Sequence, residues 1–238
     1  MPLEGLEVVF LDIDNTLYDY ERSVEEHVEA VRHAFPALGA WTPGEFLRLY
    51  WDGYARIPDE EKRALLRGSV PRYRRRVWDE ILAPIRDNAP PVDDVTRVFS
   101  DLRDRSLTPN PGALEFVRRA TAALEVGVIS NGPGDLQRRK LRALGVDRLV
   151  REDLVFISHE VGCDKPARGI FRRALDVAGV EGAACLMVGD DPVCDPGSRD
   201  VGMRFALFAG KPGDPPEVRP PPDVTVRRFA ELERAVFG

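Results

Sequence analysis

The chain has 238 residues, of which 43% are hydrophobic and 31% are charged. This composition is typical of a globular protein. Because the sequence has no apolar run long enough to span a bilayer, a transmembrane protein is excluded. The net charge is −6, from 34 basic and 40 acidic side chains, so nucleic acid is a poor candidate partner. The N-terminal residues contain no basic leader followed by a long apolar segment, so we expect a cytoplasmic protein with no membrane partner.

Short apolar runs bounded by turn residues predict strands at residues 8–11, 126–129, 154–157, 186–188 and 205–208. Stretches with helical spacing separate the last four runs. A short strand at residues 224–226 and a closing helix from residue 228 follow. Alternating strands and helices indicate an α/β fold, with a parallel, Rossmann-like sheet as its core.

The region between the first two strands contains amphipathic stretches but no convincing strand. It predicts helices at residues 24–33, 43–54, 60–66, 72–85 and 92–104, divided by proline and glycine signals. We therefore expect two domains. Residues 1–17 and 107–238 form the α/β core, and residues 18–106 form a helical insertion.

Two carboxylates follow the first predicted strand. Side chains alternate along a strand, so Asp12 and Asp14 project to the same side while Ile13 projects to the other. Two carboxylates this close repel each other, and a hard cation such as Mg²⁺ would relieve the repulsion. In open α/β sheets, ligands bind beyond the carboxyl ends of the strands, which is where this pair lies.

The later strands end in further polar groups. Ser130 and Asn131 follow the second strand, with a hydroxyl and backbone amides suited to an anion. Lys165 follows the third strand, and Asp190, Asp191 and Asp195 follow the fourth. Taken alone, each of these features also has an ordinary structural explanation. Ser130 and Asn131 could cap a helix, Lys165 could be a solvated side chain, and the aspartates could form an acidic capping turn. Together they predict a site for Mg²⁺ and a phosphate group.

Four segments carry a resemblance to a known family. They are Asp12-Ile13-Asp14-Asn15-Thr16-Leu17, Ile129-Ser130-Asn131-Gly132, Lys165-Pro166 and Gly189-Asp190-Asp191. In this order they resemble the four motifs of the haloacid dehalogenase (HAD) superfamily, in its phosphatase branch. The helical insertion resembles the α-helical cap of its dehalogenase-like and nucleotidase-like subfamily. Residues 137–141, Gln-Arg-Arg-Lys-Leu, agree with the same resemblance.

The resemblance implies a role for each matched residue. Asp12 would be the nucleophile that forms an aspartyl-phosphate, and Asp14 the general acid and base, a role that suits a carboxyl with a raised pKa. Mg²⁺ would be held by Asp12, the backbone carbonyl of Asp14 and Asp190. Lys165 would offset negative charge and act in catalysis. The substrate-binding residues would be Thr16, Ser130, Asn131 and Lys165. For Asp191 and Asp195 three roles remain possible: a further Mg²⁺ ligand, a partner of Lys165, or a residue that contacts the ligands without binding the metal.

The function predicted on this basis is Mg²⁺-dependent hydrolysis of a small phosphorylated metabolite, a sugar phosphate or a nucleoside monophosphate, by a monomer or a homodimer. A phosphomutase, a 2-haloacid dehalogenase and a non-catalytic binding protein are the alternatives. Asp14 argues against the dehalogenase, because a departing halide needs no proton whereas an alkoxide does.

Substrate choice is expected in the helical insertion. Its sharpest feature is the basic run Arg72-Tyr73-Arg74-Arg75-Arg76, which would either contact an anionic substrate or form a solvated face balanced by nearby acidic residues. His27 and His33 are expected at the surface, without a catalytic role.

Overall fold

A computed structural model describes residues 3–238, which divide into two compact units. The sheet unit contains the residues up to Asp19 together with Thr108–Gly238, and the helical unit is Tyr20–Leu107. The helical unit is thus an insertion in the sheet unit. The boundaries expected from the sequence, after residues 17 and 106, differ from this division by two residues and one residue.

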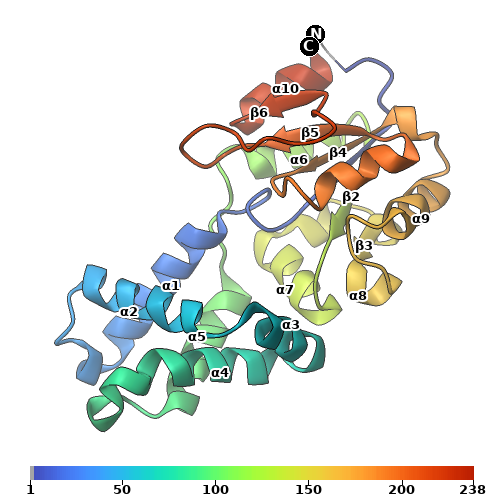
Figure 1. Ribbon diagram of the computed structural model, residues 1–238. Coiled ribbons are helices and arrows are strands. Elements are labelled where there is room, and N and C mark those ends of the chain that lie inside the picture. The colour runs from blue at the N-terminus through green and yellow to red at the C-terminus, as the bar shows by residue number, and fades with distance from the viewer. Residues whose placement is uncertain (1–2) are drawn as a thin grey trace. The chain divides into compact units, whose positions relative to one another are not determined.

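Six strands form one parallel sheet in the order β3-β2-β1-β4-β5-β6 (Figure 1). The strands are β1 (Val8–Leu11), β2 (Glu125–Ser130), β3 (Val155–Ile157), β4 (Cys185–Gly189), β5 (Arg204–Phe208) and β6 (Val224–Val226). The central strand is β1, where Val8 lies opposite Glu125 on one side and Cys185 on the other. The predicted α/β fold with a Rossmann-like core is confirmed. Because the strand order reverses beside β1, the crevice for a ligand is expected at its carboxyl end.

Helices bury the sheet. Those of the sheet unit are α6 (Ala113–Ala120), α7 (Gly134–Leu144), α8 (Ser158–Val161), α9 (Arg168–Ala178) and α10 (Phe229–Phe237), with short 3-10 turns η3 (Val146–Arg148), η4 (Glu152–Leu154), η5 (Gly182–Ala184) and η6 (Asp195–Val201). Ile170 and Phe171 of α9 join one hydrophobic cluster with Val8 and Phe10 of β1. All four residues of β1 are buried, which explains why this strand reads as an unbroken apolar run.

The helical unit has an aromatic core. Its elements are α1 (Tyr20–Ala34), η1 (Pro36–Leu38), α2 (Pro43–Arg56), α3 (Asp59–Gly68), α4 (Val70–Leu82), η2 (Ala83–Asn88) and α5 (Val92–Arg105). Trp78 of α4 is fully buried, and its ring centre lies 5.6 Å from that of Tyr50 and 5.2 Å from that of Phe99. At Gly53, a Cβ would come within 2.7 Å of the Ile81 backbone, so α2 and α4 pack this closely only because glycine is there. Among residues 3–238, no helix has both the length and the apolar character needed to cross a membrane.

The fourth helix of this unit differs from its prediction of residues 72–85. It begins at Val70 because Ser69 caps it, accepting a hydrogen bond from the Arg72 amide at 3.4 Å. It ends at Leu82 because Pro84 has no amide hydrogen to give the Glu80 carbonyl. The Arg56 guanidinium donates to that carbonyl at 2.8 Å, so the oxygen released by the proline is satisfied by a neighbouring helix.

The surface position expected for His27 is wrong. His27 is buried in the helical unit, with its ring edge-to-face against Phe99 and its Nε2 3.5 Å from the Ser106 hydroxyl. Burial and the nearby Arg103 guanidinium lower the pKa of His27 to about 4. It shares a helix face with the buried Val24 and Val28, so the helical spacing outweighs the polarity of the side chain. His33 is exposed, as expected.

Candidate active site

Polar side chains from several strand ends meet in one cavity of about 330 Å³ in the sheet unit. The lining residues are Asp12, Asp14, Asn15, Ser130, Asn131, Lys165, Asp190, Asp191, Pro192 and Cys194. The four sequence segments with functional residues therefore come together at the carboxyl ends of β1, β2 and β4. Seven of the lining residues have a carboxylate, amide or hydroxyl group, and Lys165 supplies the single ammonium.

Lys165 forms the buried centre of the site. Its Nζ donates to Asp12 Oδ1 at 2.7 Å and to Asp195 Oδ1 at 2.6 Å. Burial opposes the lysine charge, but the two carboxylates outweigh it and raise the pKa of Lys165. Burial also raises the pKa of Asp12, and the attraction of Lys165 offsets only part of that rise. The three side chains thus form a tightly coupled group in which Asp12 still reaches the cavity.

Asp14 has a separate set of partners. Tyr18 donates its hydroxyl hydrogen to Oδ1 at 2.5 Å, and Lys140 Nζ lies 2.7 Å from both carboxylate oxygens. Gln137 Nε2 donates to Oδ2 at 3.1 Å. Burial works against ionisation, but Lys140 and the hydrogen bonds outweigh it and lower the pKa of Asp14 to about 2. The raised pKa expected from neighbouring acids is therefore wrong for this arrangement, because a buried ammonium from α7 faces the carboxylate.

The turn after β4 separates the roles of its three aspartates. Asp195 is fully buried and is the partner of Lys165. Asp191 caps the turn instead, since its Oδ1 accepts from the amides of Val193 and Cys194, both at 2.8 Å. Asp190 lines the cavity, and burial together with the charge of Asp12 raises its pKa to about 8.

Gly189 makes this turn fit. A Cβ at Gly189 would lie 2.0 Å from Asp195 Oδ2, so only glycine lets that carboxylate pass under the strand end on its way to Lys165. The Asp191 amide donates to the same oxygen at 3.0 Å, which fixes the carboxylate from the other side.

Ser130 and Asn131 lie where the sequence places them, whereas Thr16 does not. Ser130 Oγ accepts from Gln137 at 2.7 Å. The Asn131 side chain exchanges two hydrogen bonds with the Lys165 backbone, at 2.8 and 3.0 Å, and so ties the end of β2 to the lysine loop. Thr16 is fully buried, its hydroxyl has no hydrogen-bond partner, and it is not among the cavity residues.

The position of Thr16 follows from the turn before it. Asn15 adopts a left-handed conformation with φ of 56°, and Asn110 Nδ2 donates to the carbonyls of Asn15 and Thr16 at 3.0 and 2.8 Å. This turn leaves Asn15 at the cavity and directs Thr16 into the core.

Sequence reasoning missed Tyr18, Gln137 and Lys140 as contacts of the site. Gln137 and Lys140 lie three residues apart on α7 and therefore share a face, and both are buried. A buried glutamine and lysine on the same face as Leu141 and Leu144 is the signal that could have identified them, because long polar side chains are rarely buried without a partner.

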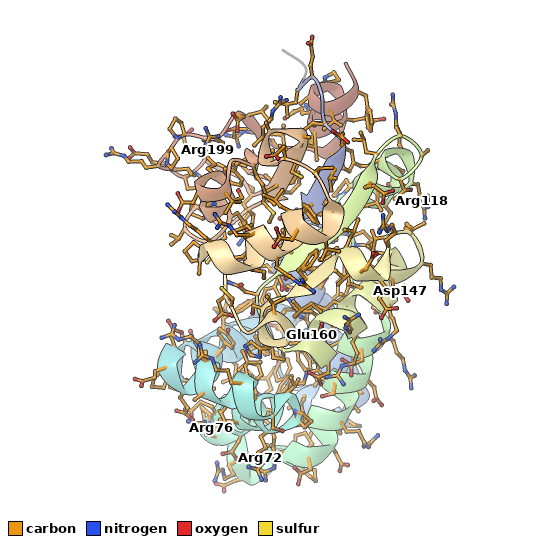
Figure 2. The ribbon with its side chains drawn as sticks, turned by 90° about the vertical axis from the view of Figure 1, so that its right-hand side faces the viewer. Arg72, Arg76, Arg118, Asp147, Glu160 and Arg199 are labelled. Carbon is orange, nitrogen blue, oxygen red and sulfur yellow. The ribbon has the colours of Figure 1, made fainter. Side chains whose placement is uncertain are left out.

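The basic run of the helical unit is largely engaged by acidic side chains. Arg74 is buried and donates to Asp104 at 2.8 Å. Arg75 donates to Asp93 at 2.7 Å. Arg72 and Arg76 are the two labelled positions of this run in Figure 2, and Arg76 pairs with Glu61 and Glu80, both at 2.8 Å.

Comparison with known proteins gives the family. The haloacid dehalogenase-like hydrolase family model matches residues 6–196. A phosphoserine phosphatase from Thermus thermophilus is 33% identical over 163 residues, which cover 67% of this chain and 64% of the relative. The pyrimidine 5'-nucleotidase YjjG from Escherichia coli is 34% identical over 53% of this chain and 56% of its own length. The chain therefore spans less than two thirds of the length of these two relatives.

Solved structures share the fold over nearly the whole chain. The HAD-hydrolase YfnB from Bacillus subtilis, in a form bound to magnesium, superposes with a TM-score of 0.69 at 14% identity and covers 99% of this chain and 100% of its own. The L-2-haloacid dehalogenase RSc1362 gives a TM-score of 0.69 at 20% identity, over 98% and 100% of the two chains. At these identities the likeness concerns the fold alone. With the family match over residues 6–196, the protein belongs to the haloacid dehalogenase-like hydrolases.

Proposed function

We propose that this chain is a Mg²⁺-dependent phosphomonoester hydrolase that acts on a small phosphorylated metabolite through an aspartyl-phosphate. The observation that carries the proposal is that two carboxylates at one cavity are each paired with a buried lysine. Asp12 is paired with Lys165, and Asp14 is paired with Lys140. A phosphate ester needs both a nucleophile for phosphorus and a group that handles the proton of the leaving alcohol. Relatives named as a phosphatase and a nucleotidase support the same reaction class.

Four residues at the cavity, Asp12, Lys165, Ser130 and Asn131, act on the phosphoryl group in the proposed reaction. An oxygen of Asp12 attacks phosphorus, and the ester oxygen leaves with the bonding electrons. Lys165 neutralises charge that accumulates between Asp12 and the phosphoryl group. Ser130 and Asn131 bind phosphoryl oxygens as the transferring group flattens.

Asp14 handles the proton in both halves of the reaction. It gives a proton to the leaving oxygen, and it takes one from the water that later cleaves the aspartyl-phosphate, which restores Asp12 and frees phosphate. The ionised form held by Lys140 is the form that accepts the proton. A bound phosphate dianion adds negative charge near Asp14 and raises its pKa, which is the direction that proton donation requires.

The donor groups at the cavity fit a hard cation. Among residues 3–238, no cluster of three or more His, Cys, Asp or Glu side chains is arranged for a metal. The proposed ligands are accordingly two carboxylates, of Asp12 and Asp190, and the Asp14 carbonyl, which are oxygen donors throughout. Burial and the surrounding carboxylates raise the pKa of Asp190 to about 8, so its ionised form is disfavoured until a cation compensates the charge. When bound, Mg²⁺ supplies charge neutralisation for the attack of one anion on another.

The expected substrate is a sugar phosphate or a nucleoside monophosphate, and the expected assembly is a monomer or a homodimer. A 2-haloacid dehalogenase is the less favoured alternative, because the hydrogen-bonded Asp14 provides proton transfer that halide departure does not need. A phosphomutase would use the same residues and is distinguished by its product, an isomer in place of free phosphate.

Phosphate release tests the proposal. The purified chain is assayed with p-nitrophenyl phosphate and a panel of sugar phosphates and nucleotides, in Mg²⁺ and in chelator, beside Asp12→Asn. A matched control is Asp147→Asn, an exposed aspartate of the sheet unit (Figure 2). We expect Mg²⁺-dependent release that is lost in Asp12→Asn and retained in Asp147→Asn. The absence of phosphate release from every compound by the folded wild-type chain would contradict the proposed function.

A further inference from the structure

The ionic partner of Asp14 lies outside the cavity. Lys140 is buried on α7 and is not among the cavity residues, yet its Nζ contacts both oxygens of the Asp14 carboxylate at 2.7 Å. Placing an ammonium in a buried position is costly unless a carboxylate compensates. The contact joins positions 126 residues apart, so it holds the end of β1 and α7 together at the cavity.

Gln137, one helical turn before Lys140, connects Asp14 to the second strand end. Its Nε2 lies 3.1 Å from Asp14 Oδ2, 2.7 Å from Ser130 Oγ and 2.8 Å from the Asn131 carbonyl. A primary amide has two hydrogens, so three acceptors share two donors. The contact with Asp14 Oδ2 is the longest of the three and the weakest hydrogen bond.

The two oxygens of Asp14 therefore differ. Oδ1 accepts from the Tyr18 hydroxyl at 2.5 Å and from Lys140, whereas Oδ2 has Lys140 and only the shared amide hydrogen of Gln137. Oδ1 is fixed, and Oδ2 keeps the capacity to exchange a partner for a substrate atom. The Asp14 side chain is 32% exposed, compared with 8% for Lys140, so the carboxylate reaches the cavity while the ammonium stays behind it.

We propose that Lys140 and Gln137 are positioning residues for the leaving group: they hold Asp14 in one orientation, with Oδ2 directed to the ester oxygen of the substrate. The inference rests on the proposed phosphatase function. In the step concerned, Asp14 first takes up a proton from solvent as the phosphate dianion binds, and this proton passes from Oδ2 to the ester oxygen as the bond from phosphorus to that oxygen breaks, so that a neutral alcohol leaves and Asp14 returns to its ionised form. Lys140 and Gln137 exchange no proton with the substrate and act through Asp14.

The dependence on the leaving group tests this role. p-Nitrophenolate departs without a proton, whereas the alkoxide of an alkyl or sugar phosphate needs one. For Lys140→Met, we expect kcat on an alkyl phosphate to fall by about 100-fold and kcat on p-nitrophenyl phosphate to change by less than about threefold. Lys140→Arg keeps the charge and is expected to recover part of the loss on the alkyl phosphate. Arg142→Met, at an exposed position of the same helix, is the matched control and should leave both rates unchanged.

A cycle with Asp14→Asn shows whether Lys140 acts through Asp14. In the Asp14→Asn background, adding Lys140→Met should not alter the ratio of the two rates any further. If Lys140→Met does not fold, Gln137→Leu tests the same prediction through the second contact, with a smaller change of the ratio in the same direction.

The possible outcomes separate the inference from the proposed function. An equal fall of both rates in Lys140→Met would show that Lys140 only supports the fold, and no fall of either would show that the reaction does not need it. Either result would overturn the inference while phosphatase activity stands. A wild-type chain that releases no phosphate from either substrate overturns the proposed function and this inference with it.

Discussion

Buried charges occur in both units of the molecule, but they are balanced differently. In the helical unit, two buried cations each have a neighbouring anion: Arg74 pairs with Asp104 at 2.8 Å and Lys62 pairs with Asp59 at 3.0 Å. In the sheet unit, four aspartates line a cavity that contains one lysine. Balanced pairs hold a fold together, whereas an excess of one sign at a cavity indicates a ligand of the opposite sign. Burial of charge alone would not have distinguished the two.

The largest expected effect is that of Asp190→Asn, which removes part of the excess negative charge. We expect activity in Mg²⁺ to fall by about a thousandfold, or about 4 kcal/mol of transition-state stabilisation. Without metal the variant should be more stable than wild type, because burial and neighbouring carboxylates raise the pKa of Asp190 to about 8 and so disfavour its ionised form. Mg²⁺ should raise the Tm of the wild type only. A variant with full activity would place the cation elsewhere.

The next largest effect lies in the helical unit and concerns packing. Trp78→Ala removes a fully buried indole from the cluster with Tyr50 and Phe99, and we expect a loss of about 4 kcal/mol in the free energy of unfolding. Urea denaturation followed by circular dichroism measures it. Trp51→Ala, at a half-buried position, is the comparison and should cost less. Equal losses would mean that Trp78 is not the centre of this core.

The pH dependence of stability is a further test of buried groups in the helical unit, where His27 is a buried base. Its pKa is about 4 in the folded chain and 6.5 without that environment, so the unfolded chain binds more protons between these values. The free energy of unfolding should therefore fall as the pH drops through this window, by about 3 kcal/mol in all. His27→Leu should remove this dependence and His33→Leu should keep it. Urea midpoints at both ends of the window measure it, and an unchanged slope in His27→Leu would assign the dependence to other groups.

The smallest effect is expected for an exposed ion pair. Arg75 and Asp93 lie 2.7 Å apart at the surface of the helical unit, where solvent screens them. Arg75→Ala should change the free energy of unfolding by less than about 0.5 kcal/mol and leave phosphate release unaltered. A clear loss of substrate affinity would instead assign this arginine to substrate recognition.

The sequence predicted the strand ends well for a physical reason. Asp12, Ser130 and Asp190 each follow an unbroken apolar run, and parallel strands bring such ends to one edge of a sheet. Local signals suffice for such positions. The capping box of Thr42 and Glu45 at the start of α2 is another feature set by residues close in the sequence.

Other features depended on contacts that no local pattern contains. The partner of Asp14 lies 126 residues away on a helix, so the helical spacing could mark Lys140 as buried but could not pair it with Asp14 or predict the lowered pKa. Thr16 was misplaced because the left-handed turn at Asn15 reverses the direction of the next side chain. The choice between Asp191 and Asp195 depended on the path of a turn with prolines, which only the three-dimensional structure resolves.

The strand order also bears on how the chain acquires its structure during synthesis. β1 is made first, yet its two partners begin at Glu125 and Cys185, so the central strand waits unpaired until most of the chain has been translated. The helical unit is continuous in sequence and can complete its own contacts in that interval. Contacts of such long sequence separation slow folding and leave apolar strands exposed to other chains. The rate at which β4 docks on β1 is therefore expected to set the yield of native protein, and a cavity that forms only then stays inactive until the last of its strands is in place.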